Sequence, residues 1–244
     1  GFYIETYGCQ MNEYDSELVR SILKKSGYGE VEEAESADII LLNTCSVREH
    51  AHNKVHGRLQ RLQRLRVNKP VIIGVLGCMA QNLKMDLLEN SIHVDLVAGP
   101  DSYRKLPRLI DEARDGNGKA AAIDLSEFEI YDDIYPERRE GVNAWVAVMR
   151  GCDNFCTFCV VPYTRGRERS RPLGSVVDET HSLVSAGYTQ VTLLGQNVNS
   201  YEHDGHSFAD LMKAVAEVPG IKRVRFTSPH PKDFPDDLFE VIRD

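Results

Sequence analysis

The N-terminal half of the chain alternates between apolar runs and amphipathic stretches. Continuous apolar runs bounded by turn residues are typical of buried parallel strands, whereas apolar residues spaced three or four apart are typical of helices. We expect strands at residues 2–7, 37–43, 70–76 and 94–98, and helices at 16–25, 47–65, 83–88 and 106–113. This alternation predicts βαβ units in an α/β domain with an open parallel sheet of the Rossmann or flavodoxin-like kind.

The alternation restarts after an irregular stretch. Residues 115–118 are a turn signal, and residues 124–140 are acidic and aromatic and contain Pro136, which favours a linker. Further strands are expected at 145–149, 190–194 and 222–226, and helices at 174–186, 207–217 and 235–243. We therefore predict an α/β domain at 1–117, a linker at 118–143 and a partial (βα) barrel at 144–244. Three βα units cannot close a barrel, so we expect the front part of a longer protein.

Composition narrows the class of protein. The chain has 244 residues, 42% of them hydrophobic and 27% charged, as in globular proteins. We find neither a secretory signal nor an apolar run of about 20 residues that could span a bilayer, so we expect a cytoplasmic protein without a membrane partner. Cytosolic thiols stay reduced, and the six cysteines therefore indicate metal binding or catalysis. Proteins that bind nucleic acid mainly through phosphates usually carry a positive field. The net charge of −8 therefore argues against broad electrostatic binding of nucleic acid and leaves only local patches for it.

Three cysteines lie close together in the second half, with the spacing Cys-x3-Cys-x2-Cys at Cys152, Cys156 and Cys159. Three thiolates can hold three irons of a [4Fe–4S] cube and leave the fourth iron to a ligand that is not protein. Electron-transfer ferredoxins usually use four cysteines. The triplet therefore predicts a reactive cluster. The polar pair Gln196 and Asn197 follows the expected strand at 190–194, at the end where barrel active sites lie.

The other three cysteines, Cys9, Cys45 and Cys78, each follow one of the first three expected strands. The carboxyl ends of parallel strands share one edge of a sheet, so these thiols can converge there. The helices that follow favour thiolates through their positive N-terminal dipoles. We predict a second three-cysteine cluster. Buried apolar cysteines and a structural zinc site are the alternatives.

Several motifs carry a family resemblance. Residues 152–159 match the radical S-adenosylmethionine (SAM) signature, with Phe158 as its aromatic, and the chain as a whole resembles the methylthiotransferases. The matching segments lie between residues 6 and 201: Thr6–Asn12, Asn43–Arg48, Gly77–Gln81, Arg150–Pro162, Arg165–Pro172 and Leu194–Tyr201. The later barrel strands and the C-terminal RNA-binding TRAM domain of that family are absent from the sequence.

The resemblance implies an enzyme that converts N6-isopentenyladenosine at tRNA position 37 to its 2-methylthio form. It implies two [4Fe–4S] clusters and SAM. The cluster on Cys152, Cys156 and Cys159 would cleave SAM, and the auxiliary cluster on the other three cysteines would donate sulfur. Phe158 and the Gln196–Asn197 pair are expected to contact SAM. Expected partners are the anticodon loop of tRNA, an electron donor such as flavodoxin or ferredoxin, and a sulfur source.

Other interpretations remain open. A sibling methylthiotransferase would act on threonylcarbamoyl-adenosine in tRNA or on an aspartate of a ribosomal protein. A two-cluster electron-transfer protein would need no SAM. Four arginines of one short segment, Arg165, Arg167, Arg169 and Arg171, are candidates for phosphate or carboxylate contacts near the tRNA entrance, and a solvated face with internal ion pairs is the alternative.

Overall fold

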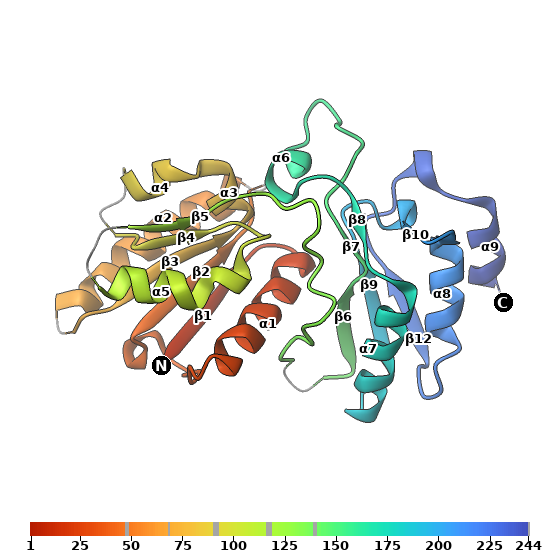
Figure 1. Ribbon diagram of the computed structural model, residues 1–244, viewed down its shortest axis with the longest axis horizontal. Helices are drawn as coiled ribbons and strands as arrows, with labels where there is room; N and C mark the ends of the chain where they lie inside the picture. The colour runs from red at the N-terminus through yellow and green to blue at the C-terminus, as the bar shows by residue number, and fades with distance from the viewer. Residues whose placement is uncertain (47–48, 68, 90–92, 116–118, 139–140, 244) are drawn as a thin grey trace.

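A computed structural model of the chain describes residues 1–46, 49–67, 69–89, 93–115, 119–138 and 141–243. Two α/β units lie next to each other, the N-terminal one in red to yellow-green and the C-terminal one in green to blue (Figure 1). The first unit contains β1 to β5 and the second contains β6, β9 and β12. The expected α/β class, an open parallel sheet followed by the front part of a (βα) barrel, is confirmed by this arrangement.

The sheet of the first unit is parallel throughout. Its strands are β1 (Phe2–Tyr7), β2 (Ile39–Thr44), β3 (Ile72–Gly77), β4 (Leu96–Ala98) and β5 (Ala120–Ala122), adjacent in that order. β2 is buried along its whole length, as expected for an apolar strand covered on both faces. The order follows the sequence, without the reversal that Rossmann and flavodoxin sheets have.

Helices cover both faces of this sheet. The helices α1 (Gln10–Lys25) and α5 (Leu106–Arg114) pack against one face through residues such as Leu18 and Leu109. The other face is covered by α2 (Glu49–Leu62), α3 (Cys78–Leu83) and α4 (Met85–Glu89). Both faces are therefore apolar, which explains why the strands appear in the sequence as continuous hydrophobic runs.

The second unit has a parallel sheet in the order β12–β9–β6, made of β6 (Asn143–Ala147), β9 (Gln190–Leu194) and β12 (Arg223–Phe226). The helices α7 (Leu173–Ser185), α8 (Phe208–Ala216) and α9 (Asp236–Arg243) follow these strands. A core of Val146, Leu193 and Phe208 with their neighbours joins sheet and helices. The arrangement is the βα repeat that the sequence predicts.

Short elements complete the second unit. The strands β7 (Met149–Arg150) and β8 (Arg169–Ser170) pair antiparallel and close the base of a loop that holds the helix α6 (Val161–Arg165). A small hairpin is formed by β10 (Glu202–His203) and β11 (His206–Ser207). Single 3₁₀ turns are η1 (Ala34–Ser36), η2 (Gln63–Val67), η3 (Tyr103–Lys105), η4 (Val198–Ser200) and η5 (Pro231–Asp233).

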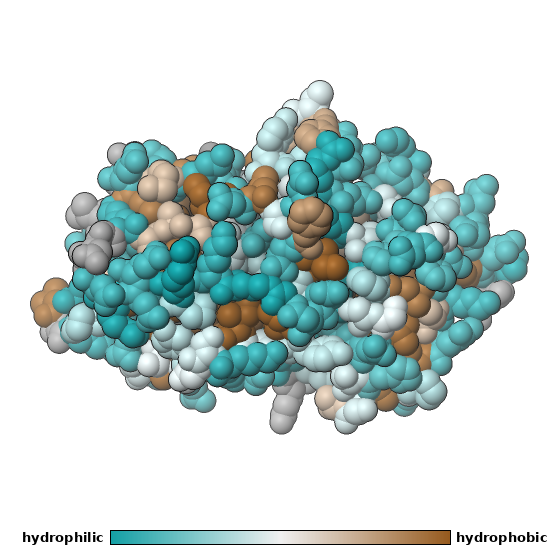
Figure 2. Space-filling view, viewed as in Figure 1, coloured by the Kyte–Doolittle hydropathy of each residue, from teal (hydrophilic) through white to brown (hydrophobic). Residues whose placement is uncertain are grey.

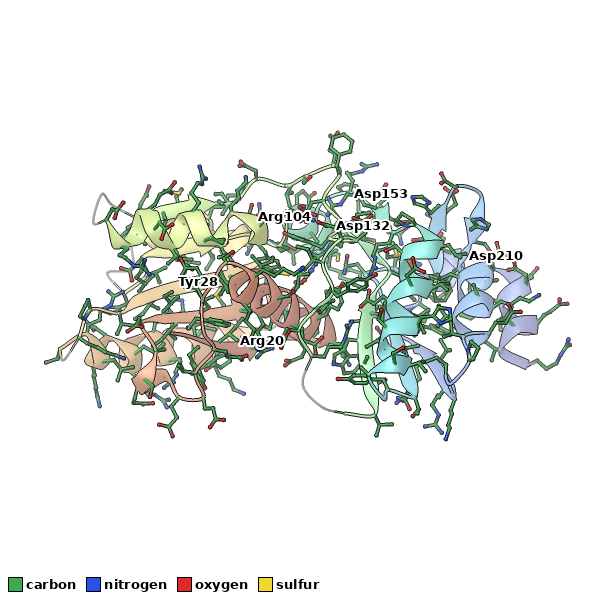
Figure 3. All side chains as sticks on the ribbon, turned by 60° about the horizontal axis from the view of Figure 1, so that its bottom comes forward. Arg20, Tyr28, Arg104, Asp132, Asp153 and Asp210 are labelled. Carbon is green, nitrogen blue, oxygen red and sulfur yellow. The ribbon has the colours of Figure 1, made fainter. Side chains whose placement is uncertain are left out.

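The connection between the units is packed against both of them. Tyr131 is fully buried, stacks on Tyr103 of the first unit and lies 4.7 Å under the guanidinium of Arg150 of the second. Arg104, which is labelled in Figure 3, forms ion pairs with Glu129 and Asp133 of the connecting segment. These contacts explain why residues 124–138 of the acidic, aromatic stretch are ordered between the two units; we call this segment the strap.

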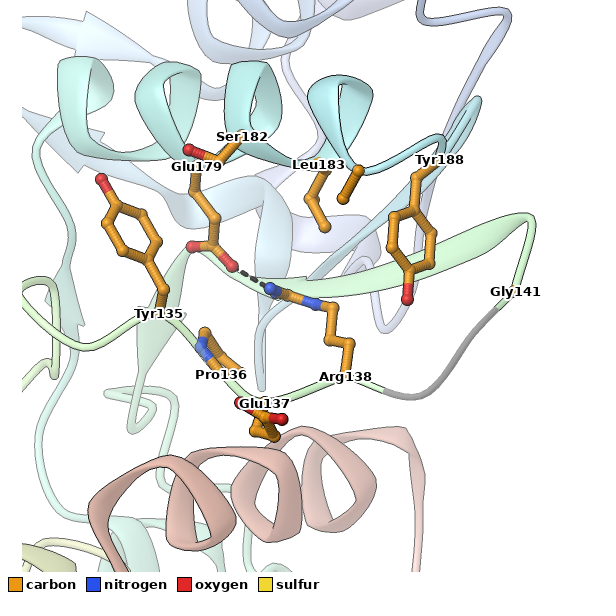
Figure 4. A pocket seen from close by; sticks show the side chains of 10 residues that line it. Tyr135, Pro136, Glu137, Arg138, Gly141, Glu179, Ser182, Leu183 and Tyr188 are labelled. Atoms are coloured by element: carbon orange, nitrogen blue, oxygen red, sulfur yellow. Dashed lines mark hydrogen bonds and ion pairs between the residues drawn. The ribbon is translucent and has the colours of Figure 1, made fainter. Parts of the chain in front are cut away.

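The strap is also anchored to α7. Arg138 forms an ion pair with Glu179 at the side of a cavity of about 550 Å³ between the strap and α7 (Figure 4). The first sheet extends to Ala122 through β5, past the boundary expected at residue 117, and β6 begins at Asn143. The connection between the two sheets therefore begins after Ala122, later than the expected start at residue 118.

Hydrophilic side chains dominate the face of the molecule in Figure 2. In the part of the chain that the structure describes, no helix combines the length and apolarity needed to cross a bilayer.

Candidate active site

Cys9, Cys45 and Cys78 come together at the carboxyl edge of the first sheet, as their positions after β1, β2 and β3 lead one to expect. All three line one cavity of about 170 Å³. Local sequence explains the sharp turns that place them. Gly77 has φ +86°, and a Cβ there would lie 2.7 Å from the carbonyl oxygen of Thr44, so only glycine lets the chain enter α3 directly after β3.

Cys9 is fixed by the start of α1. The side-chain oxygen of Asn12 accepts a hydrogen bond from the Cys9 backbone N–H at 3.2 Å, as the third residue of a capping box does. The Asn12 amide nitrogen in turn donates to Asn43 Oδ1 and to the Thr44 carbonyl, both at 3.3 Å. The fully buried Asn12 therefore couples the turn after β1 to the end of β2, next to Cys45.

The cavity is shared between the two units. Its walls from the second unit include Arg165 of α6, Gly195 and Gln196 after β9, and Ser228 after β12. Gly195, Gln196 and Ser228 follow the carboxyl ends of barrel strands, where barrel active sites lie. The carboxyl edges of the two sheets therefore face each other across the cavity that the thiols line.

The three thiols differ in acidity. A hydrogen bond with Cys45 is the largest cause that lowers the pKa of Cys9 to about 5, and Arg165 acts in the same direction. Burial raises the pKa of Cys78 and outweighs the effect of Arg165 on it. Cys9 is thus ready to bind a metal as a thiolate, whereas the Cys78 thiol must release a proton when it does so.

Cys152, Cys156 and Cys159 lie on the loop between β7 and β8. The Cys152 backbone N–H donates to the Gly166 carbonyl at 3.2 Å, and the Cys159 N–H donates to the Cys156 carbonyl at 2.9 Å. Cys152 is buried, which raises its pKa, and the charges of Cys156 and Cys159 add to that shift. The two later cysteines are partly exposed. The triplet thus lies on one loop of the second unit and does not line the cavity of the other three thiols.

The three candidate SAM contacts lie in different environments. Phe158 is 91% exposed. Gln196 lines the thiol cavity, and its side-chain oxygen is buried without a hydrogen-bond partner. Asn197 is buried and donates to Asp233 at 2.7 Å, while its own oxygen also has no partner. Buried unpaired oxygens are uncommon, and the two adjacent ones at this strand end are acceptors available to a ligand.

The arginine segment does not have the role of a phosphate-binding surface. Three of its members are buried and bind carboxylates of this chain: Arg165 with Asp15, Arg169 with Asp101 and Arg171 with Glu179. Only Arg167, 65% exposed, extends towards solvent, where it pairs with Asp153. The phosphate interpretation is therefore wrong for the three buried arginines, which form the internal ion pairs of the alternative interpretation but do not lie on a solvated face.

Sequence reasoning missed the residue at the centre of this network. Asp15 is fully buried on α1 and accepts from Arg150 and Arg165, each at 2.7 Å. The Tyr103 hydroxyl also donates to it at 3.2 Å. The sequence contains one indication that Asp15 is buried: it lies four positions after Met11 and three before Leu18, on the apolar stripe of α1.

The donors around the cavity suit an iron–sulfur group. In the described part of the chain, no three His, Cys, Asp or Glu side chains are grouped closely enough to share one metal ion. A structural zinc ion uses four protein ligands, whereas a cube can be held by three thiolates, so three thiols around one cavity fit a cube better than a structural zinc ion. The cation of Arg165 on the cavity wall offsets part of the negative charge of such ligands.

Comparison with known proteins assigns the class. Residues 1–99 match the family described as "Uncharacterized protein family UPF0004", and residues 146–244 match the radical SAM superfamily. The structure of the radical SAM methyltransferase TsrM from Kitasatospora setae has a similar fold, with a TM-score of 0.68 at 14% identity, over 99% of this chain and 56% of its own. Residues 146–244 therefore form a radical SAM domain, a class that uses SAM and an iron–sulfur cluster as cofactors.

Closer relatives match nearly the whole chain. The chain is 53% identical over 243 residues to tRNA-2-methylthio-N(6)-dimethylallyladenosine synthase of Chloroherpeton thalassium and 52% identical over 248 residues to that of Parabacteroides distasonis. Each match covers 98% of this chain and 54% of the relative, so the chain spans about half the length of the curated relatives it matches. Over the half of their length that it spans, the chain is similar to these tRNA-2-methylthio-N(6)-dimethylallyladenosine synthases.

Proposed function

We propose that this chain contributes the two cluster-binding units of an enzyme that adds a methylthio group to C2 of N6-isopentenyladenosine at tRNA position 37. The observation that carries the proposal is the pair of separate cysteine triads on two units whose sheet edges face each other. Two [4Fe–4S] clusters held by three cysteines each would both keep one iron free for another ligand. Relatives named as synthases of 2-methylthio-dimethylallyladenosine support this substrate over threonylcarbamoyl-adenosine or a ribosomal aspartate.

The target is an unactivated aromatic C–H bond, from which no side-chain acid or base removes hydrogen at neutral pH. When bound, one [4Fe–4S] cluster supplies the electron for reductive cleavage of SAM and the other supplies the sulfur. Cys152, Cys156 and Cys159 hold the first, and Cys9, Cys45 and Cys78 hold the second.

The remaining site residues orient SAM and the base. The buried, unpaired oxygens of Gln196 and Asn197 accept hydrogen bonds from SAM, because they lie after β9 at the carboxyl edge of the barrel. Phe158, exposed beside the cysteine triplet, covers SAM once it is bound. The adenine base enters at the seam between the units, since hydrogen abstraction and sulfur transfer occur at the same carbon.

Three partners complete the reaction. The tRNA presents its anticodon loop, and single-stranded loops are the usual targets of base-specific RNA recognition. A flavodoxin or ferredoxin supplies electrons, and a sulfur source replenishes the auxiliary cluster. The chain has a net charge of −8, so we assign most of the phosphate affinity to parts of the enzyme outside it.

Separating the two triads tests the proposal. In the full-length protein that contains this chain, two triads should hold about eight irons, and replacing Cys152, Cys156 and Cys159 by alanine should leave about four. Cys78→Ala should abolish methylthiolation and keep the release of 5′-deoxyadenosine from SAM, whereas Cys156→Ala should abolish both. A Cys78→Ala protein that keeps the radical cluster but releases no 5′-deoxyadenosine would refute this division of roles. An electron-transfer protein would release none in any form.

A further inference from the structure

Arg165 links the two units directly at the thiol cavity. It is the last residue of α6, the helix that follows the Cys152–Cys159 loop, yet its Nε donates to the Cys78 sulfur of the other unit at 3.2 Å. This contact joins residues 87 positions apart in the sequence. The cysteine site of the first unit is therefore completed by a side chain of the second.

Arg165 is held in this position by a buried carboxylate. Its Nη2 donates to Asp15 Oδ2 at 2.7 Å, while Arg150 Nη2 binds Asp15 Oδ1 at the same distance. The exposed fractions of the three side chains are 4%, 0% and 2%. Two guanidinium groups on one carboxylate leave one positive charge uncompensated in a buried place, which is costly unless further negative charge lies nearby.

The remaining donor of Arg165 indicates where that negative charge belongs. Its Nη1 is buried without a hydrogen-bond partner, and Arg165 lines the cavity with the three thiols. A buried, unpartnered guanidinium nitrogen is costly to leave unsatisfied. Thiolates and an anionic group in the cavity would compensate both the charge and the donor. A contact that only held the two units together would not need the Arg165 guanidinium to donate to the Cys78 sulfur.

We propose that Arg165 is the positioning residue of the auxiliary centre and that it sets the reduction potential of the iron–sulfur group held by Cys9, Cys45 and Cys78. The inference rests on the proposed function. Hydrogen bonds to ligand sulfurs and nearby positive charge stabilise the reduced, more negative state of a cluster, so they raise its potential. The reduction potential of the auxiliary centre is then set by a residue of the unit that carries the radical cluster. Asp15 holds the guanidinium of Arg165 in the position that this requires.

The test isolates the auxiliary centre. The full-length protein with Cys152, Cys156 and Cys159 replaced by alanine is reconstituted anaerobically, and its midpoint potential is measured by a redox titration followed by EPR. We expect Arg165→Gln to shift the potential to a more negative value with about four irons still bound. Arg167→Gln is the matched control, because Arg167 lies in the same segment, is exposed and pairs with Asp153; it should leave the potential unchanged.

Each outcome decides the inference. An Arg165→Gln protein with four irons and the parent potential overturns it. If that variant fails to retain the cluster, Arg165→Lys decides, since lysine keeps the charge and loses the fork that reaches both Asp15 and Cys78. A midpoint potential of Arg165→Lys that is more negative than that of the parent supports the inference, and an unchanged potential overturns it. A parent protein that binds no iron at this site would instead count against the proposed function.

Discussion

Replacing Asp15 by asparagine should strongly destabilise the fold. Asp15 is fully buried and binds two buried arginines, both contributed by the other unit. Removing one partner of a buried ion pair costs about 3–5 kcal/mol, because the remaining charge stays desolvated. Here one carboxylate serves two cations, so we expect about 5 kcal/mol, a third or more of the stability of a typical domain.

Urea unfolding of the metal-free protein measures this loss. Trp145, the single tryptophan, belongs to a cluster with Met11 and Tyr14 of α1, so its fluorescence reports on docking of the two units. The matched control is Asp111→Asn, since Asp111 is 62% exposed in its pair with Arg114 and such pairs contribute at most about 1 kcal/mol. A free energy of unfolding for Asp15→Asn within about 0.5 kcal/mol of the parent would refute the reasoning.

Two further changes test the fold around the site. Burial raises the pKa of Glu17 from 4.5 to about 7, so its protonated form stabilises the fold below pH 4.5 and this contribution disappears as pH rises through 7. Glu17→Gln should therefore gain up to about 3 kcal/mol over the parent between pH 5 and 8 by urea unfolding, and a constant difference would contradict this. Gly151 has φ +78°, and a Cβ there would lie 2.0 Å from the Arg167 carbonyl oxygen. Gly151→Ala should lower thermal stability by about 1–3 kcal/mol, unlike Gly174→Ala, where no atom lies within 4 Å; equal melting temperatures would exclude the clash.

The sheet strands could be predicted because burial on both faces produces apolar runs. Residues 37–43 and 70–76 were expected as strands, and the structure has β2 at Ile39–Thr44 and β3 at Ile72–Gly77. β5 was missed because its three alanines carry no hydrophobic pattern. The start of α1 was placed six residues late, since the cap formed by Asn12 on Cys9 precedes the periodic apolar residues.

The cysteine sites could be proposed from spacing and position, because strand ends of a parallel sheet must lie at one edge. The arginine network could not. Arg165 and Asp15 are 150 residues apart, and Arg169 and Asp101 are 68 apart. A dense run of arginines looks the same in sequence whether its partners are phosphates or carboxylates, and only the packing of the folded chain decides between them.

The central claim is tested most directly by the product formed on tRNA. The full-length protein that contains this chain, reconstituted anaerobically with iron and sulfide, is incubated with SAM, a reductant and tRNA bearing N6-isopentenyladenosine, and the nucleosides are separated and identified by mass spectrometry. The account predicts conversion of this nucleoside to its 2-methylthio form, dependent on both cysteine triads. Unchanged isopentenyladenosine in a protein that holds both clusters and cleaves SAM would contradict it.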